Sequence, residues 1–321
     1  MDVALGVLGL GAGVALIVAG AELFAEHLGS AAARLGISTF ALALLLAGAE
    51  PEELATTVTG SLRHVPAVAF GDVVGANVAV CLVALAVGAL AMSRRGGVLP
   101  FGGRVLPYAL LGLPVGAISV AVAWDGHIGR LGGTVLVATY VLYVGTIWVR
   151  ERHPPAIGEA GEVEEHAHDD GPAHTGRDVA LVLGGVAAMV GGAVLVVEGL
   201  RAITDVQSRQ TELSLTLIGF ATAFELVVLA WSAARRGITE AVVASVVGSF
   251  AYNATMSLGV AALARPLHIH DAASLHVPLV LMVASLALVL LLAVPRRRLD
   301  ATGAIVLLLA YPLFLGYVIA R

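Results

Sequence analysis

Long apolar stretches are the feature that most constrains what this chain can fold into. Ten of them approach or exceed the roughly 20 residues that an α-helix needs to cross the hydrocarbon core of a membrane. The predicted spans are Val3–His27, Ile37–Leu62, Pro66–Met92, Val105–Ala123, Leu131–Val149, Val179–Ala202, Leu213–Ala233, Thr239–Ala264, Leu275–Val294 and Ala301–Ala320. Alternating strand patterns are absent, so the sequence predicts an all-α polytopic membrane protein and not an outer-membrane barrel.

The arginines indicate which loops face the cytoplasm. All 18 basic residues are arginine, and with the N-terminus outside, twelve of them fall on the cytoplasmic side and six on the other. This asymmetry follows the positive-inside rule. The sequence therefore predicts a multi-pass protein of the plasma membrane with both termini external. The first apolar run lacks a basic n-region, which favours a retained span over a cleavable signal peptide.

One clearly soluble segment, residues 150–177, lies between the fifth and sixth predicted spans, on the cytoplasmic side. Its proline, glycine, acidic and histidine residues favour a solvated, disordered hinge. A weak divalent-metal sensor is the second interpretation. That sensor would use His166, His168, Asp169, Asp170 and His174.

The position of this loop divides the chain into two halves, residues 1–149 and 178–321, each with five predicted spans. If the halves are homologous, an odd number of spans per half requires them to lie in opposite orientations across the membrane. The sequence therefore predicts two inverted five-helix repeats. Such repeats are typical of transporters, whose ion sites lie near the midplane between the repeats.

Carboxylates inside apolar segments give the strongest functional signal. Glu50, Glu52 and Glu53 lie in the second predicted span, and Glu225 lies in a similar apolar setting in the seventh. A carboxylate at bilayer depth costs roughly 2.5–3.5 kcal/mol even on the mildest insertion scale, so such residues are functional by default. We therefore predict an ion site built from both halves.

Two pairs of short segments carry a resemblance to a known family. In the first half they are Gly48–Leu54 (GAEPEEL) and Gly71–Asn77 (GDVVGAN), and in the second half Thr222–Leu226 (TAFEL) and Ala244–Phe250 (ASVVGSF). These segments resemble the GTSLPEL and GNxxGSN motifs that occur twice in the cation/calcium exchanger superfamily. The resemblance covers both repeats, the five-plus-five layout and the internal loop.

The resemblance implies roles for individual residues. The motif glutamate of each repeat is the central cation ligand in that family, and the matching residues are Glu53 and Glu225. Thr222 stands at the motif serine, and Ser249 and Asn253 match oxygen-bearing positions on the following helix. Oxygen ligands of this kind suit hard cations such as calcium and sodium. No cofactor is expected beyond the transported cations.

The first repeat departs from the family pattern. Ala76 and Val80 stand where the family has oxygen-bearing side chains, so at least one flanking ion site is expected to be lost. Glu50 stands at a serine position, one helical turn before Glu53, where the two acids should interact. Neighbouring buried carboxylates rarely both ionise, so this pair is expected to share a proton.

Four further polar residues have open roles. Asn77 is included among the predicted ion-site residues, although helix capping or interhelical hydrogen bonding explains both Asn77 and Asp72 about as well. Glu52 is adjacent to Glu53 and is not expected to be a ligand. Glu22 lies near the end of the first span and is interpreted as a gate or interface residue.

The sequence thus predicts a cation antiporter that exchanges sodium or calcium, against protons, by alternating access. The alternatives are an ordinary sodium/calcium exchanger, an uncoupled ion channel, and a degenerate, non-transporting member that acts as a membrane sensor. No phosphate loop, nucleophile elbow or HExxH motif is present, so no enzyme is expected. Membrane lipid and inorganic cations are the expected partners, and the net charge of −5 gives no sign of nucleic-acid binding.

Overall fold

The computed structural model describes residues 3–34, 50–102, 105–151, 175–236 and 239–320. Its first half contains α1 (Val3–Arg34), α3 (Pro51–Leu62), α4 (Pro66–Ala79), η1 (Val80–Ala84), α5 (Leu85–Ser93), β1 (Leu99–Pro100), α6 (Val105–Ala123), β2 (His127–Ile128) and α7 (Arg130–Glu151). Its second half contains α9 (Thr175–Ile203), α10 (Gln207–Leu213), η2 (Ser214–Ile218), α11 (Gly219–Arg236), α12 (Thr239–Ala251), η3 (Tyr252–Ser257), α13 (Leu258–Ala264), β3 (Leu267–His268), α14 (Ala273–Ala293), η4 (Val294–Arg296), β4 (Arg298–Leu299) and α15 (Ala301–Ile319).

The predicted all-α polytopic fold is confirmed. Within the described ranges, nine helical segments are long and apolar enough to cross a membrane. The tenth predicted span, Ile37–Leu62, falls partly on residues 35–49, which lie outside the described residues, and α3 is its second part. Both hypotheses for the central loop concern a segment that is mostly outside the described residues too.

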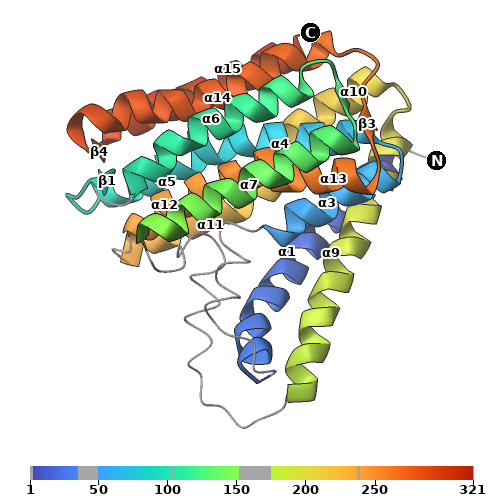
Figure 1. Ribbon diagram of the computed structural model, residues 1–321, viewed down its shortest axis with the longest axis horizontal. Coiled ribbons are helices and arrows are strands. Elements are labelled where there is room, and N and C mark those ends of the chain that lie inside the picture. The colour runs from blue at the N-terminus through green and yellow to red at the C-terminus, as the bar shows by residue number, and fades with distance from the viewer. Residues whose placement is uncertain (1–2, 35–49, 103–104, 152–174, 237–238, 321) are drawn as a thin grey trace.

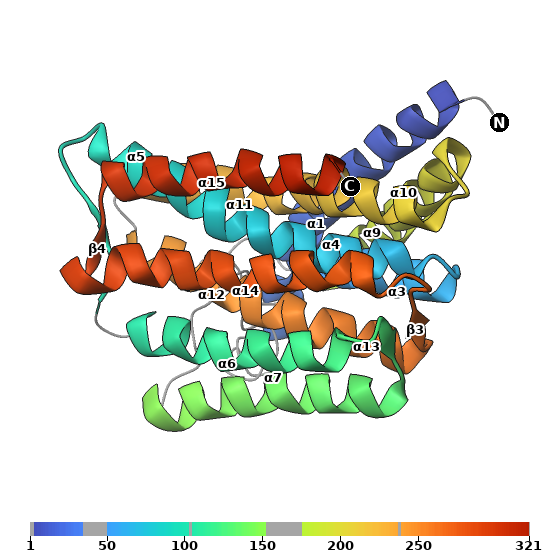
Figure 2. The same cartoon turned by 90° about the horizontal axis from the view of Figure 1, so that it is seen from above.

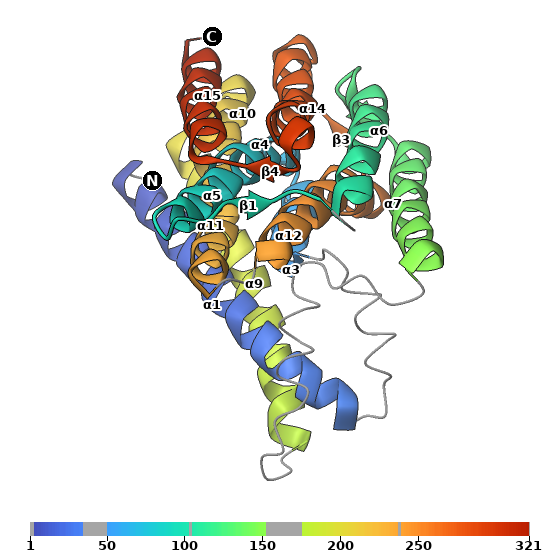
Figure 3. The ribbon, with the colours of Figure 1, turned by 90° about the vertical axis from the view of Figure 1, so that its left-hand side faces the viewer.

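The helices form a central group with a partial surround. Figure 3 shows α15, α14, α6 and α7 in an arc around α4, α5 and α12, and Figure 2 shows the same four helices running side by side. The long helices α1 and α9 lie together at a steep angle to the others (Figure 1). Most residues of α4, α5, α12 and α13 are buried, whereas the arc helices each leave one apolar side exposed. The exposed apolar sides are suited to contact with lipid.

The order of elements is the same in the two halves. Each half has a long first helix (α1 or α9), an acid-bearing helix (α3 or α11), and a helix interrupted by a π-helical turn (α4–η1–α5 or α12–η3–α13). Two further helices follow, α6 and α7 or α14 and α15, and a two-residue strand precedes each of them. Equivalent elements thus recur in one order, as expected for a duplicated unit.

The strand pairing obeys the same equivalence. β1 pairs antiparallel with β4, and β2 pairs antiparallel with β3. By position in the repeats, β1 is equivalent to β3 and β4 is equivalent to β2. Exchanging the two halves therefore converts one ribbon into the other, which is what a two-fold relation between the repeats requires.

The inversion of the repeats is visible where their equivalent first helices, α1 and α9, pack together. Glycines at seven-residue intervals meet across the two helices, and an added Cβ would come within 2.6–2.8 Å of the facing backbone oxygen. The facing pairs are Gly6 with Gly199, Gly13 with Gly192, and Gly20 with Gly185. One residue number rises as the other falls, so these equivalent helices are antiparallel and the repeats have opposite orientations.

Contacts between loops agree with the predicted alternation of spans. Arg95 donates a hydrogen bond to the Arg235 carbonyl oxygen, and the sequence places both residues on the cytoplasmic side. Arg201 donates a hydrogen bond to the Arg63 carbonyl oxygen, and the sequence places both residues on the opposite side. In both contacts, helix ends that the sequence assigned to the same side of the membrane lie next to each other.

The glycine contacts between α1 and α9 predict opposite outcomes for two adjacent substitutions. Gly192→Ala places a methyl group 2.6 Å from the Gly13 carbonyl oxygen and should destabilise the protein by about 1–3 kcal/mol through overpacking. Gly191→Ala meets only the end of the Leu16 side chain at 3.8 Å and should leave stability unchanged or slightly higher. Thermal unfolding in detergent, monitored by the labelling of the buried Cys81 thiol, compares the two variants. Equal unfolding temperatures for both variants would contradict the close helix contact.

Candidate cation-binding site

The first acidic segment lies at the start of α3. Pro51 occupies the first helical position, where a missing N–H costs nothing, and the Glu50 carbonyl accepts the Leu54 N–H at 3.0 Å. Glu52 and Glu53 follow in the first turn. The partial positive charge of a helix N-terminus favours negative side chains at these positions.

The second acidic segment is positioned by irregular helix geometry. The helix that carries Thr222 and Glu225 follows the π-helical turn Ser214–Ile218, and Asn253 lies in the π-helical turn Tyr252–Ser257. Such turns are rare and often occur at functional sites, because the extra residue changes which side chains face a neighbouring helix.

Asn253 connects the second repeat to the first acidic segment. Its Nδ2 donates to Glu50 Oε2 at 3.1 Å and to Ser249 Oγ at 3.2 Å. The hydroxyl of Ser257 donates to Asn253 Oδ1 at 3.4 Å, which fixes the orientation of the amide. All four side chains are buried, so this chain of contacts lies inside the protein.

Thr222 makes the second contact between the repeats. Its hydroxyl donates to Asp72 Oδ1 at 2.8 Å, and both side chains are buried. Close packing brings their helices together, since a Cβ on Gly75 would lie 2.3 Å from the Leu215 carbonyl oxygen. The interhelical hydrogen bond that the sequence left open for Asp72 is therefore present.

Glu53 lies between these two contacts. It is fully buried, and its carboxylate interacts electrostatically with those of Glu50, Asp72 and Glu52. Four carboxylate oxygens of Glu50, Glu53 and Asp72 have no hydrogen-bond donor among the described residues: both of Glu53, Oε1 of Glu50 and Oδ2 of Asp72. We call Glu50, Glu53 and Asp72 the inner acid cluster.

A cavity of about 410 Å³ adjoins this cluster, lined by residues of α1, α3, α11 and Glu50. Its wall carries four carboxylates, those of Glu22, Glu50, Glu52 and Glu225. Glu53 is not among its lining residues, so Glu50 is the one member of the inner acid cluster that reaches the cavity. We call this space the acid cavity.

None of the ion pairs found among the described residues involves the inner acid cluster. Among the described residues no arginine side chain is buried. An ionised carboxylate buried without a partner costs several kcal/mol, so protons or cations must supply the missing positive charge. The described carboxylates do not converge as a preformed metal site, because no group of three is arranged to hold an ion. A bound cation would need small movements of these side chains, or water, to complete its shell.

The structure brings most of the predicted site residues together. Glu50, Ser249 and Asn253 form one connected group, and Thr222 joins the cluster through Asp72. Glu225 is partly exposed and faces the acid cavity.

The structure describes contacts for three residues whose roles the sequence left open or did not assign to the site. Asn77 donates to the Phe250 carbonyl oxygen at 3.4 Å, and none of the hydrogen bonds described for it reaches a carboxylate. Glu52 faces the acid cavity and was not expected at the site. Asp72 belongs to the inner acid cluster, and the signal that identified Glu53, an acid in an apolar span, applied to it equally.

Comparison with known proteins identifies the family. The family model for sodium/calcium exchanger protein matches residues 5–149 and 178–320. The chain belongs to this family. Comparison with curated protein sequences finds no match.

Solved structures of a relative confirm the fold. They are of the sodium-calcium exchanger NCX_Mj. The structure soaked with 10 mM Na⁺ and zero Ca²⁺ is 20% identical in sequence, with a TM-score of 0.61 over 98% of this chain and 99% of that one. The structure soaked with 10 mM Na⁺ and 10 mM Sr²⁺ is 19% identical, with a TM-score of 0.59 over 98% of each chain. The fold is thus that of an exchanger with inverted repeats.

The Thr222 hydroxyl provides a test of the contact between the repeats. Thr222→Val removes the donor to Asp72 and should cost about 1–3 kcal/mol, because a buried acceptor loses its partner. Thr222→Ser keeps the hydroxyl and should retain most of the stability. Thermal unfolding in cation-free detergent solution measures both, and a valine variant as stable as the parent would contradict the contact.

Proposed function

We propose that the chain is an antiporter that exchanges sodium or calcium for protons by alternating access. Its transport site would be the inner acid cluster, with the acid cavity as the approach to it. The observation that carries this proposal is the set of buried carboxylate oxygens without donors, next to a cavity with further carboxylates. Such oxygens suit an exchangeable cation, which can occupy the position that a fixed arginine would otherwise take.

The ligand chemistry favours a hard cation. Every polar side chain at the cluster offers oxygen, and no cysteine or histidine takes part. Calcium and sodium prefer carboxylate, carbonyl and hydroxyl oxygens. We assign the primary ligands to Glu53 and Glu50, with Asp72, Ser249 and Asn253 completing the shell. Glu225 would attract the ion into the acid cavity and bind it in a second state of the transport cycle.

The proton leg of the cycle rests on Glu50 and Glu53. Without a cation, two adjacent buried carboxylates are stabilised when one proton is shared between them. An arriving cation displaces that proton, because both carboxylates are then needed as ligands. Glu50 also lines the acid cavity, so the proton has a path toward water through a residue of the site itself.

The arrangement of the chain fits such a cycle. The halves 1–149 and 178–321 would be the two units that rock against each other, joined by the cytoplasmic loop 150–177. Both termini would be external in the plasma membrane, as the arginine distribution predicts. The hydrogen bonds that Asn253 and Thr222 donate to acids of the first repeat lie at the interface that would rearrange.

Sodium/calcium exchange without protons is the second candidate, and the family match favours it. Two buried residues of the first repeat argue against it. Ala76 and Val80 offer no side-chain oxygen where the family motif has one, so a full set of sodium sites has too few ligands. The functional assay separates the two candidates directly.

Reconstituted transport tests the proposal. Proteoliposomes loaded with calcium or sodium, and given an inward-directed proton gradient, should take up protons as the cation leaves. Glu53→Gln and Glu225→Gln should reduce this exchange to the level of protein-free liposomes, because each removes a charge needed to hold the cation. Glu50→Gln should weaken cation binding, because it removes the charge of one primary ligand, and should reduce the number of protons exchanged for each cation.

Glu198→Gln is the matched control, since Glu198 pairs with Arg63 and Arg201 near the surface, away from the cluster. It should transport at nearly the parent rate. Sodium/calcium exchange that is indifferent to the pH gradient would favour the second candidate. Rapid, non-saturating flux would indicate a channel, and the absence of any cation flux would overturn both candidates.

The pH dependence of cation binding follows from competition for the same oxygens. Protons occupy the carboxylates at low pH, so calcium or sodium should raise the unfolding temperature more at high pH. Each proton released on binding increases the apparent affinity by up to about tenfold per pH unit. Thermal unfolding with and without the cation, from pH 5.5 to 8.5, measures the effect. Stabilisation that is constant across this range would contradict proton displacement.

A further inference from the structure

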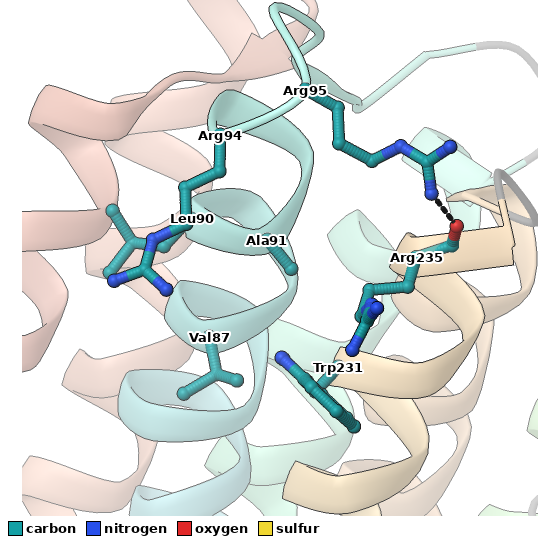
Figure 4. Close-up of a pocket in the computed structure, with 7 residues that line it drawn as sticks. All are labelled: Val87, Leu90, Ala91, Arg94, Arg95, Trp231 and Arg235. Atoms are coloured by element: carbon teal, nitrogen blue, oxygen red, sulfur yellow. Dashed lines mark hydrogen bonds between the residues drawn. The ribbon is translucent and has the colours of Figure 1, made fainter.

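A second cavity, of about 610 Å³, lies at the cytoplasmic ends of α5 and α11, away from the acid cluster. Its lining combines three arginines with an aromatic ring and an aliphatic wall, as Figure 4 shows. The lining residues are Val87, Leu90, Ala91, Arg94, Arg95, Trp231 and Arg235. We call it the arginine cavity.

The arginine cavity is strongly positive. No carboxylate lines it among the described residues, and none of the ion pairs described in this structure involves Arg94, Arg95 or Arg235. Two helix C-termini contribute about half a negative charge each, and the three guanidinium groups contribute three positive charges. A net positive charge of about two therefore remains. The cavity therefore attracts an anion.

The arginines are held by neighbouring groups. Arg95 extends toward α11 and donates to the Arg235 carbonyl oxygen at the end of that helix (Figure 4). The Arg235 guanidinium lies over the Trp231 ring, 4.7 Å from its centre. Arg94 extends from the other side of the α5 terminus, beside Leu90. Arginines that flank one opening in this way can contact a phosphate from two sides.

The position of the cavity relative to the membrane suggests what the anion is. The apolar spans end at Ser93 and Arg235, so the arginines stand where the hydrocarbon core gives way to headgroups. Val87, Leu90 and the half-exposed Trp231 continue the cavity wall toward the apolar side. A ligand that fits both parts has a phosphate at one end and acyl chains at the other.

We propose that the arginine cavity binds the phosphate headgroup of an anionic phospholipid from the cytoplasmic leaflet. Three guanidinium groups surround the phosphate, and Val87, Leu90 and Trp231 contact the adjoining acyl chains. Basic pockets between transmembrane helices on the cytoplasmic side are suited to such headgroups. This inference does not depend on the ion-exchange proposal, because no member of the acid cluster lines the cavity.

The site can be tested by lipid binding to the full chain in neutral detergent. Native mass spectrometry and thermal unfolding would compare phosphatidylglycerol with phosphatidylcholine of the same chain length. The parent protein should bind phosphatidylglycerol more tightly than phosphatidylcholine, and phosphatidylglycerol should stabilise it more. Arg94→Gln with Arg235→Gln should weaken that binding about 25-fold, at roughly fivefold for each arginine. Arg95 is left in place because it caps α11.

Two matched double variants distinguish specific lipid binding at the cavity from a general effect of charge and from misfolding. Arg296→Gln with Arg298→Gln removes the same charge on the same side of the membrane, outside the cavity lining, and should bind phosphatidylglycerol like the parent. Arg94→Lys with Arg235→Lys keeps the charge and should retain the preference for phosphatidylglycerol, with weaker binding.

Three results would overturn the proposal. The first is equal binding of the two lipids, and the second is an equal loss in the glutamine variants at the cavity and outside it. The third is stabilisation of the protein by inorganic phosphate alone, at the same concentration and with the same dependence on Arg94 and Arg235, since that would show a site for free phosphate in place of a lipid.

Discussion

Negative charge buried without a basic partner is the constraint on which the rest of this structure depends. Glu50, Glu53 and Asp72 lie together inside the protein, and Glu52 and Glu225 face the adjoining cavity. A protein that needed only stability would have apolar residues in place of Glu50, Glu53 and Asp72, because a buried charge without a partner costs several kcal/mol. Carboxylates kept in this state need mobile positive charge, and cations or protons are the available kinds.

The inverted repeats explain how such a site is held and how it can change. Asn253 and Thr222 of the second repeat donate hydrogen bonds to Glu50 and Asp72 of the first, so the second repeat supplies donors to the acids of the first. The closely packed glycines of α1 and α9 join the same two halves along a further interface. A relative movement of the halves would alter the donors around the carboxylates, which links the shape of the protein to its affinity for a cation.

Much of this fold could be predicted from the sequence. Apolar length predicts the spans, and an odd number of spans per half implies inversion of homologous halves, while the sides that arginine counts assign remain a prediction. The resemblance of the two motif pairs to the exchanger family indicated Thr222, Ser249 and Asn253, which the structure places at the acids or their direct partners. These inferences succeed because they rest on local composition and on distances along a helix.

Contacts between helices that are distant in sequence were harder to predict. Glu52 was set aside because it adjoins Glu53, yet the start of α3 turns it toward the acid cavity. The sequence left Asn77 open between ion contact and an interhelical hydrogen bond, and in the structure its amide donates to the Phe250 carbonyl oxygen. The arginine cavity was not predicted, because the positive-inside rule already accounted for its arginines. Which side of a helix meets which neighbour depends on packing across the repeats, and one sequence does not reveal it.

The coupling of cation and proton at the acid cluster is the central claim, and proton release on binding tests it most directly. Titration calorimetry of the detergent-solubilised chain with calcium or sodium, in buffers of different ionisation enthalpy, counts the protons released for each ion bound. This account predicts saturable binding with net proton release near neutral pH, and a smaller release in Glu50→Gln. Saturable binding whose heat is the same in every buffer would contradict it.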